Sequence, residues 1–282
     1  MKIILIGKGT ILYQIAAMIK KIKHFKLKLI LWDGKSNNLS DQYYYKNSKK
    51  LNKTIKIRNI NSKKSIDILN KIDFDYLLSI NNTQIFKKVF LQIFKNQIIN
   101  YHYSLIPSYK GLYSCTKVLL KKEKYTGISW HFVTKKIDQG DLVYQKRIKI
   151  NNKDNASSLI IKLNNLCLKT FNEFISNLKK NKIILSKNKK IKDFKLKIKD
   201  EKYSKINCNM DSKTILSIFK AFDYSPFDSP LPKVKIKFDK EYEIKNIEII
   251  KTKKIDGKFI KIDFKNYIFK SKDNKHFKVT CA

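Results

Sequence analysis

Two short segments of the chain hold side chains that could cooperate in acid–base and hydrogen-bonding chemistry. Residues 100–107 read NYHYSLIP, and residues 137–141 read IDQGD. Together they offer the Asn100 amide, the His102 imidazole and the Asp138 carboxylate, in a protein with 4 histidines. An amide and an imidazole can donate hydrogen bonds to a developing anion, and a carboxylate can orient or accept a proton. These segments are therefore the candidate chemical centre.

The local pattern predicts how these side chains are positioned. Residues 98–101 form a short apolar run that Pro107 and Gly111 bring to a turn, which predicts a buried strand followed by a loop. Asn100 and His102 are two residues apart and so face the same side of that strand. Residues 127–133 form a second apolar run, so Asp138 also follows a strand. In open α/β sheets, ligands bind at the carboxyl ends of the strands.

The first part of the chain alternates between strand and helix patterns. Strands are predicted at residues 1–6, 25–32, 76–80 and 142–150, and helices at 11–23, 65–72, 84–94 and 156–178. Residues 40–61 are polar and rich in tyrosine and lysine, and we interpret them as an irregular surface passage. The alternation predicts an α/β fold with a doubly wound sheet and right-handed crossovers.

The pattern changes after residue 180. Residues 179–202 are dense in lysine with few apolar anchors, which is typical of a linker. Beyond them come a helix at 211–222, three prolines, and short β-type runs at 234–238, 242–251, 259–264, 267–269 and 277–279. Several short strands with turn signals predict a small barrel. We therefore expect a catalytic domain over residues 1–180, a linker over 181–203 and a β-rich domain over 204–282.

The formal net charge of +39 has two interpretations. Only Arg58 and Arg147 are arginine among 62 basic residues, and the chain is rich in Asn and Ile, as expected when a genome drifts toward A/T-rich codons. Proteins that read phosphates or bases usually recruit arginine for its bidentate geometry. Composition drift and a polyanionic partner both remain open, because such a charge attracts polyanions whatever its origin.

Composition also indicates compartment and metal use. The apolar start of the chain is interrupted by Gly7, Lys8 and Gly9, so it is too short for a secretion signal or a membrane span, and we expect a cytoplasmic protein. The four cysteines are Cys115, Cys167, Cys208 and Cys281. Their spacing fits neither a metal site nor a disulfide framework, so we expect reduced thiols and no bound metal.

The spacing of the two segments carries a family resemblance. The pattern N-x-H-x-S-L-I-P-x-Y-x-G over residues 100–111, then Gly127, then D-x-G-D over residues 138–141, resembles the signature of formyltransferases that use 10-formyltetrahydrofolate. The resemblance covers roughly residues 1–178 and is closest to stand-alone domains and to those associated with nonribosomal peptide synthetases. It implies a Rossmann-like domain with a parallel-rich twisted sheet. The tail resembles the C-terminal OB-like domain of methionyl-tRNA formyltransferase-like proteins.

The resemblance implies an N-formyltransferase, in which an amine attacks the formyl carbon and negative charge develops on the formyl oxygen. Asn100 and His102 would donate hydrogen bonds to that oxyanion. Asp138 would orient the imidazole or a water molecule and pass a proton from the amine to the leaving nitrogen. Asp141 is a rival carboxylate, and His131 is interpreted as a packing residue near the pocket.

The resemblance also implies two binding regions. The pterin of the folate would lie against one segment and one loop, whose residues are Asn82, Thr83, Gln84, Ile85, Phe86, Val133, Lys136 and Ile137; Gln84 stands where some relatives carry arginine. The acceptor would contact Gly7, Lys8, Gly9, Thr10, Ser104 and Tyr113. The glycine-rich stretch that starts at Gly7 either holds an acceptor phosphate on free N–H groups or is a plain tight turn. Ser104 has a competing interpretation as a residue that orders its own loop.

The acceptor amine is the open question. We expect a free or carrier-bound amino acid, with initiator methionyl-tRNA or a nucleotide-linked amino sugar as alternatives, and neither a membrane nor a DNA partner. Methionyl-tRNA formyltransferases generally continue after the equivalent of Gly111 with small residues and proline, whereas this chain reads LYSC. A non-catalytic RNA-binding relative is a different class of protein. Binding RNA through lysines makes no use of Asn100, His102 and Asp138 together, which argues against it.

Overall fold

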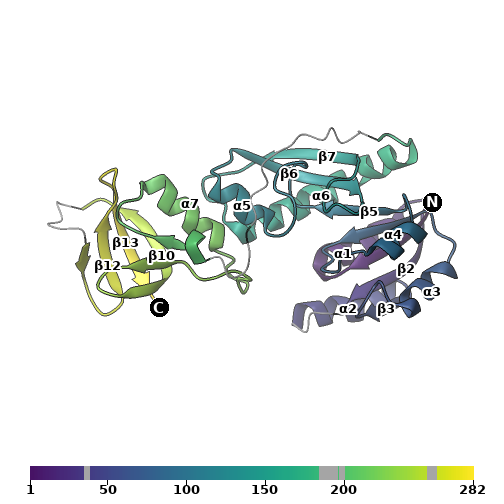
Figure 1. The fold of residues 1–282 in the computed structure, drawn as a ribbon, viewed down its shortest axis with the longest axis horizontal. Helices are drawn as coiled ribbons and strands as arrows, with labels where there is room; N and C mark the ends of the chain where they lie inside the picture. The colour runs from purple at the N-terminus through teal and green to yellow at the C-terminus, as the bar shows by residue number, and fades with distance from the viewer. Residues whose placement is uncertain (35–38, 184–195, 197–200, 253–258) are drawn as a thin grey trace. The chain divides into compact units, whose positions relative to one another are not determined.

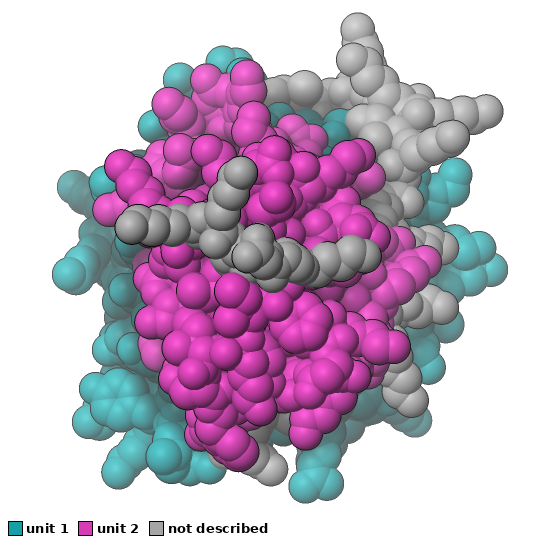
Figure 2. All heavy atoms as spheres, turned by 90° about the vertical axis from the view of Figure 1, so that its left-hand side faces the viewer, with its two compact units in different colours: residues 1–110, 127–147, 163–192 teal, residues 111–126, 148–162, 193–282 magenta. Residues whose placement is uncertain are grey.

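The structure of the protein is a computed structural model that describes residues 1–34, 39–183, 196, 201–252 and 259–282. The chain divides into two compact units (Figure 2). The first comprises residues 1–110, 127–147 and 163–192, and the second comprises residues 111–126, 148–162 and 193–282. Most of the expected linker over 181–203 lies outside the described residues. The expected domain boundaries therefore stay a prediction.

Within the described residues, the first unit is built on a seven-stranded sheet in the order β3-β2-β1-β4-β5-β6-β7 (Figure 1). Its strands are β1 (Lys2–Gly7), β2 (Lys26–Asp33), β3 (Thr54–Ile57), β4 (Tyr76–Ile80), β5 (Ile98–His102), β6 (Tyr125–Phe132) and β7 (Leu142–Lys149). The strands from β3 to β5 pair in parallel, and β6 pairs antiparallel with β5. The parallel-rich α/β fold expected from the sequence is confirmed.

Helices cover this sheet and bury its apolar side chains. They are α1 (Gly9–Lys21), α2 (Leu39–Leu51), α3 (Lys63–Asn70), α4 (Lys88–Ile93) and α6 (Ala156–Lys179). One core cluster joins β-strand residues such as Ile4 and Leu77 to Leu69 of α3 and Phe90 of α4. Phe174 of α6 stacks on Trp130 of β6, with ring centroids 4.2 Å apart. The predicted strand and helix periodicities therefore reflect real buried faces.

The prediction of an irregular surface segment over residues 40–61 is wrong. The structure forms α2 and β3 there. Tyr44 of α2 packs against Tyr13 of α1, with ring centroids 5.5 Å apart, and β3 pairs in parallel with β2. These contacts come from distant parts of the chain, so the polar composition of the segment gave no sign of them. In addition, α4 starts at Lys88 rather than residue 84.

The second unit holds a curled sheet in the order β11-β12-β13-β10-β9-β8 within the described residues (Figure 1). The strands are β8 (Lys205–Ile206), β9 (Lys235–Lys237), β10 (Glu241–Ile250), β11 (Phe259–Lys261), β12 (Asn266–Lys270) and β13 (His276–Cys281). The unit also contains α5 (Ser114–Leu120), α7 (Ser212–Phe222) and the short 3₁₀ turn η1 (Glu201–Tyr203). The β-rich character expected for this part of the chain is confirmed. The sequence did not predict α5.

Side chains join α5 to the elements of its own unit. The Ser217 hydroxyl of α7 donates to the Leu119 carbonyl at 2.5 Å, and the hydroxyls of Thr116 and Tyr224 lie 2.8 Å apart in the interior. Asp211 caps α7 by accepting a hydrogen bond from the Thr214 backbone N–H at 2.9 Å. A search of the described residues for a helix that could cross a membrane finds none.

Candidate active site

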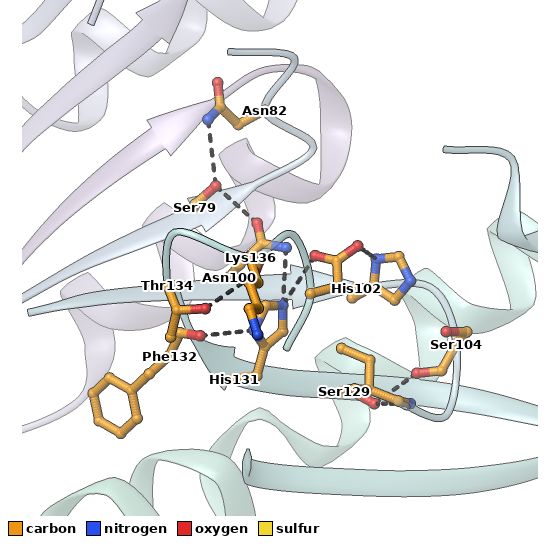
Figure 3. A network of polar contacts seen from close by, with 12 residues as sticks. Ser79, Asn82, Asn100, His102, Ser104, Ser129, His131, Phe132, Thr134 and Lys136 are labelled. Atoms are coloured by element: carbon orange, nitrogen blue, oxygen red, sulfur yellow. Dashed lines mark hydrogen bonds and ion pairs between the residues drawn. The ribbon is translucent and has the colours of Figure 1, made fainter. Parts of the chain in front are cut away.

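Asn100 lies at the centre of a polar group because of its place in the sheet. On β5 it pairs with Ser79 of β4 on one side and His131 of β6 on the other. The Ser79 hydroxyl donates to Asn100 Oδ1 at 2.9 Å, which turns the amide Nδ2 toward His131 Nε2 at 3.3 Å (Figure 3). Directly opposed residues on neighbouring strands are the closest side-chain pairs in a sheet. The strand register therefore sets the direction of the Asn100 N–H donors.

One carboxylate contacts two imidazoles beside Asn100. Asp138 Oδ2 lies 3.5 Å from His102 Nδ1, and Asp138 Oδ1 lies 3.3 Å from His131 Nε2. The three side chains are almost fully buried, with exposed fractions of 10% for Asp138, 8% for His102 and 2% for His131. We call Asn100, His102, His131 and Asp138 the histidine cluster. It joins the two segments that the sequence singled out.

Asp138 reaches the cluster by a route that the sequence did not predict. Because β6 runs antiparallel to β5, its carboxyl end lies beside the start of β5, away from His102. The following loop folds back, and Phe132 N–H donates to the Asp141 carbonyl at 2.9 Å. Asp138 is left-handed with φ of 50°, and a Cβ on Gly140 would lie 1.8 Å from the Phe132 oxygen. The loop therefore requires glycine at position 140.

Backbone carbonyls fix the orientation of both imidazoles. His102 Nε2 lies 3.1 Å from the Tyr109 carbonyl oxygen, and His131 Nδ1 lies 2.9 Å from the Phe132 carbonyl oxygen. A carbonyl only accepts, so each of these nitrogens is a donor. The other nitrogen of each ring faces Asp138.

A second polar group lies at the carboxyl ends of β1 and β2, and we call Lys8, Asp33, Asp41, Thr83 and Gln84 the aspartate cluster. Asp33 is fully buried and accepts hydrogen bonds from Thr83 N–H and Gln84 Nε2, both at 3.0 Å, and from the Thr83 hydroxyl. Burial acts to raise the pKa of Asp33, but these hydrogen bonds and the Lys8 charge outweigh it. The pKa therefore lies below its usual value, and Asp33 is ionised.

The glycine-rich stretch that starts at Gly7 lies against this cluster. A Cβ on Gly7 would lie 1.7 Å from the Ile80 carbonyl oxygen, so the close packing of β1 on β4 requires glycine. Lys8 Nζ lies 4.0 Å from Asp41 Oδ2, and a Cβ on Gly9 would lie 3.7 Å from Asp41 Oδ1. A carboxylate of the protein therefore lies beside the first residue of α1. This favours the tight-turn interpretation of the stretch over a phosphate site.

The residues expected to contact the folate divide into structural and accessible ones. Asn82 Oδ1 accepts from Gln84 N–H at 3.1 Å, while Gln84 Oε1 accepts from Ile60 N–H at 2.7 Å, so both side chains shape their own segment. Phe86 and Val133 pack in or against the core cluster. Ile85 and Ile137 are 68% and 56% exposed. Lys136 is exposed, and its carbonyl accepts the Thr134 hydroxyl at 2.9 Å.

The remaining expected acceptor contacts lie in different environments. Thr10 is exposed on the first turn of α1. Ser104 is fully buried, and its hydroxyl donates to the Ser108 carbonyl at 2.7 Å, as the loop-ordering interpretation requires. Tyr113 belongs to the second unit, where it precedes α5 with φ of 59°. The acceptor-binding roles of these residues stay predictions.

The sequence did not predict site roles for Asp33, Asp41 or His131, nor for Ser79, which hydrogen-bonds to Asn100. Ser79 lies within an apolar strand and Asp33 at the end of another, and a polar residue at the carboxyl end of a buried strand is the signal that could have indicated both. His131 was interpreted only as a packing residue, but it contacts Asn100 and Asp138 directly.

In the described part of the chain, no group of three or more His, Cys, Asp or Glu residues is arranged to hold a metal ion.

Comparison with known proteins identifies the family. A profile described as formyl transferase matches residues 1–175, which is more than half of the chain. The chain therefore belongs to the formyl transferase family, as the sequence resemblance implied.

Sequence relatives cover different parts of the chain. The bifunctional polymyxin resistance protein ArnA of Wigglesworthia glossinidia brevipalpis is 36% identical over 152 residues, which span 52% of this chain and 23% of that protein. Methionyl-tRNA formyltransferase of Finegoldia magna is 28% identical over 209 residues, spanning 73% of this chain and 66% of that enzyme. The chain thus matches less than two thirds of the length of either relative.

Two solved structures share the fold over nearly the whole chain. WlaRD, a sugar 3N-formyl transferase crystallised with dTDP and 5-N-formyl-THF, has a TM-score of 0.76 at 19% identity and covers 100% of this chain and 97% of its own. The N-formyltransferase of Helicobacter canadensis has a TM-score of 0.74 at 18% identity and covers 100% of both chains. Glycinamide ribonucleotide transformylase 1 of Symbiobacterium toebii covers only 66% of this chain, with a TM-score of 0.56 at 16% identity.

Proposed function

We propose that this protein transfers a formyl group from 10-formyltetrahydrofolate to a primary amine, and that the histidine cluster carries the reaction. The observation that supports this most is that Asp138 contacts both His102 and His131, and His131 contacts Asn100, at distances of 3.3–3.5 Å. The chemistry needs hydrogen-bond donors for an oxyanion and a group that can move a proton. The cluster provides both in one buried place.

The roles of the side chains follow from the atoms that they present. The Ser79 hydroxyl occupies Asn100 Oδ1, so Asn100 Nδ2 serves as an oxyanion donor. His102 is the second donor. The amine loses one proton when its nitrogen bonds to the formyl carbon, and the folate nitrogen gains one when its bond to that carbon breaks. Asp138, which contacts both imidazoles, would accept the first proton and return it.

Two exposed apolar side chains support a folate site beside the histidine cluster. The donor supplies the formyl group, and its flat pterin needs an apolar wall with backbone hydrogen-bonding groups at the edge. Ile85 and Ile137 are exposed apolar side chains on the two segments expected to hold it. Asn82 belongs to the first of these segments and is linked to Asn100 through the Ser79 hydroxyl, with Asn82 Nδ2 3.4 Å from Ser79 Oγ. We assign the pterin to these segments.

For the acceptor, we propose a nucleotide-linked amino sugar. The support is the likeness of the fold along the complete chain to WlaRD and to the Helicobacter canadensis enzyme, whose structure contains dTDP-3-aminofucose. The transformylase of Symbiobacterium toebii shares only part of the chain. A free or carrier-bound amino acid, the acceptor expected from the sequence, stays a prediction that no comparison tests.

Initiator methionyl-tRNA is a second candidate. Relatives of 26–28% identity include several methionyl-tRNA formyltransferases, and the net charge of +39 would attract any polyanion. A specific tRNA complex should survive in high salt, whereas lysine-driven attraction should weaken steeply because counterions compete for the phosphates. Binding that collapses with salt would remove this candidate.

The direct test presents the full chain with 10-formyltetrahydrofolate and a panel of amines. The panel holds dTDP-linked amino sugars, amino acids and charged initiator tRNA, and the assay follows both tetrahydrofolate release and the mass of each acceptor. We expect release that depends on an amino sugar and is lost in His102→Ala and Asp138→Ala. Equal release by those variants would contradict the assigned mechanism, and formylation of another amine would contradict the assigned acceptor.

A further inference from the structure

We propose that the main-chain carbonyl of Tyr109 selects the tautomer of His102, so that Nδ1, and not Nε2, is the His102 atom that serves formyl transfer. Tyr109 is then a positioning residue that acts through its backbone. The reactive role of Nδ1 rests on the proposed function, whereas the tautomer itself is a property of the protein alone.

The argument starts from the proton inventory of the ring. His102 Nε2 lies 3.1 Å from the Tyr109 oxygen, which can only accept, so Nε2 carries a proton in both the neutral and the charged ring. Nδ1 is consequently the ring nitrogen that gains or loses a proton. It faces Asp138 Oδ2 at 3.5 Å, on the side of the histidine cluster. The N–H donor expected to face the formyl oxygen is therefore Nδ1–H of the charged ring.

The Tyr109 carbonyl is aimed by an uncommon backbone conformation. Tyr109 has a left-handed backbone with φ of 57°. Residues other than Gly, Asn and Asp rarely adopt this conformation. Such strain persists only where surrounding contacts over-determine it. A carbonyl held in one direction at this position would keep the proton on His102 Nε2.

Buried hydrogen bonds hold the loop that carries this carbonyl. The Ser104 hydroxyl donates to the Ser108 carbonyl at 2.7 Å and approaches the Tyr109 carbonyl at 3.3 Å. The Ser104 carbonyl accepts the Ser129 hydroxyl of β6 at 2.6 Å. The loop is thus tied to the same strand that carries His131. This connection explains how the carbonyl of Tyr109, a half-buried residue, can be held in place.

This role of the Tyr109 carbonyl limits which residues can replace Tyr109. The role belongs to the carbonyl and to the left-handed backbone, so glycine should support it because glycine adopts positive φ without strain. Valine should not, because a β-branched side chain is a strong outlier in that region. Asn96 provides a matched control, since it is also left-handed with φ of 59° but is exposed in the turn before β5.

The first measurement uses the resting protein. Two-bond ¹⁵N–¹H correlation spectra report which nitrogen of each imidazole is protonated, and His102→Gln assigns the His102 signals among the 4 histidines. We expect neutral His102 to be protonated at Nε2. A spectrum with neutral His102 protonated at Nδ1 would overturn the proposal, even in an active enzyme. If the expected tautomer is seen but no amine is formylated, the proposed function fails and the tautomer assignment stands.

The second measurement tests the cause. Tyr109→Gly should keep the Nε2–H tautomer and a kcat within a few-fold of the parent protein. Tyr109→Val should mix the tautomers and lower kcat at least about 100-fold, since losing a donor or presenting the wrong tautomer costs 10²–10⁴ in comparable sites. Asn96→Val should change neither. Retention of the tautomer and of kcat in Tyr109→Val would remove the Tyr109 carbonyl as the cause, and the wild-type spectrum decides the tautomer even if that variant does not fold.

Discussion

The histidine cluster and the aspartate cluster both form at strand ends of the seven-stranded sheet, but they use their charges differently. In the aspartate cluster, Asp33 receives hydrogen bonds from Thr83 and Gln84, and Lys8 lies near Asp41. In the histidine cluster, one carboxylate faces two imidazole nitrogens while backbone carbonyls hold the other two. The first arrangement saturates its charges and stabilises the fold. The second brings together a carboxylate and two imidazoles, the group types that acid–base catalysis uses.

The largest expected effect separates the clusters by activity. His102→Ala and Asn100→Ala should each lower amine-dependent tetrahydrofolate release by about 100-fold or more, because each removes a proposed oxyanion donor. The midpoint of thermal unfolding should change little in either variant. His24→Ala, at an exposed histidine, is the matched control and should retain full activity. Activity of His102→Ala close to that of the control would end the contrast between the clusters.

A smaller loss of activity is expected at His131, which the sequence predicted only as a packing residue. His131→Leu keeps an apolar side chain on β6 but removes the contacts to Asn100 Nδ2 and Asp138 Oδ1. Misplaced catalytic groups cost about 10- to 100-fold, so kcat should fall by that range. The pH profile should also change, because Asp138 loses one of its two imidazole neighbours. A variant with unchanged kcat and pH profile would return His131 to a packing role.

In the aspartate cluster, substitution should affect stability rather than chemistry. Asp33→Asn should lower the free energy of unfolding by about 1–3 kcal/mol near neutral pH, since it disrupts buried charged hydrogen bonds. The folded pKa of Asp33 lies below 3.8, so its stabilisation is complete above that value and is lost as the pH falls through the folded pKa. Measured by urea unfolding, the free energy of unfolding should fall less steeply with decreasing pH in Asp33→Asn than in the unmodified protein.

The exposed Asp67 of α3 supplies the control for this measurement, as Asp67→Asn makes the same charge change at the surface. It should alter the unfolding free energy by less than about 0.5 kcal/mol. An effect of Asp33→Asn no greater than that of Asp67→Asn would show that the hydrogen bonds around Asp33 do not stabilise the fold.

The smallest expected effect concerns the start of α1. Asp41→Asn removes the carboxylate beside Gly9, so the positive end of the helix dipole should attract inorganic phosphate a few-fold more strongly, as expected for about 0.3–1 kcal/mol. Amide shifts of Gly9, Thr10 and Ile11 on phosphate titration report binding at this place. Asp67→Asn again controls for net charge. Tight phosphate binding at these amides in the unmodified protein would instead restore the acceptor-phosphate interpretation.

The sequence predicted much of the fold because its signals are local. Residues 76–80 have the apolar run of a buried strand and form β4 as expected, and the helix expected over 156–178 is found as α6. The prediction for residues 40–61 failed because α2 and β3 depend on contacts with α1 and β2. A pattern within a segment cannot report a partner that lies elsewhere in the chain.

By itself, the sequence determined the family signature and the alternation that puts Asn100 and His102 on one side of β5, because side-chain direction in a strand depends only on spacing. The tertiary structure decided their partners. The antiparallel pairing of β6 puts His131 opposite Asn100, and the fold-back at Gly140 brings Asp138 to both histidines. It also put Asp41 beside Gly9. Strand order, strand direction and loop return are long-range choices set by packing of the whole unit, which no short motif encodes.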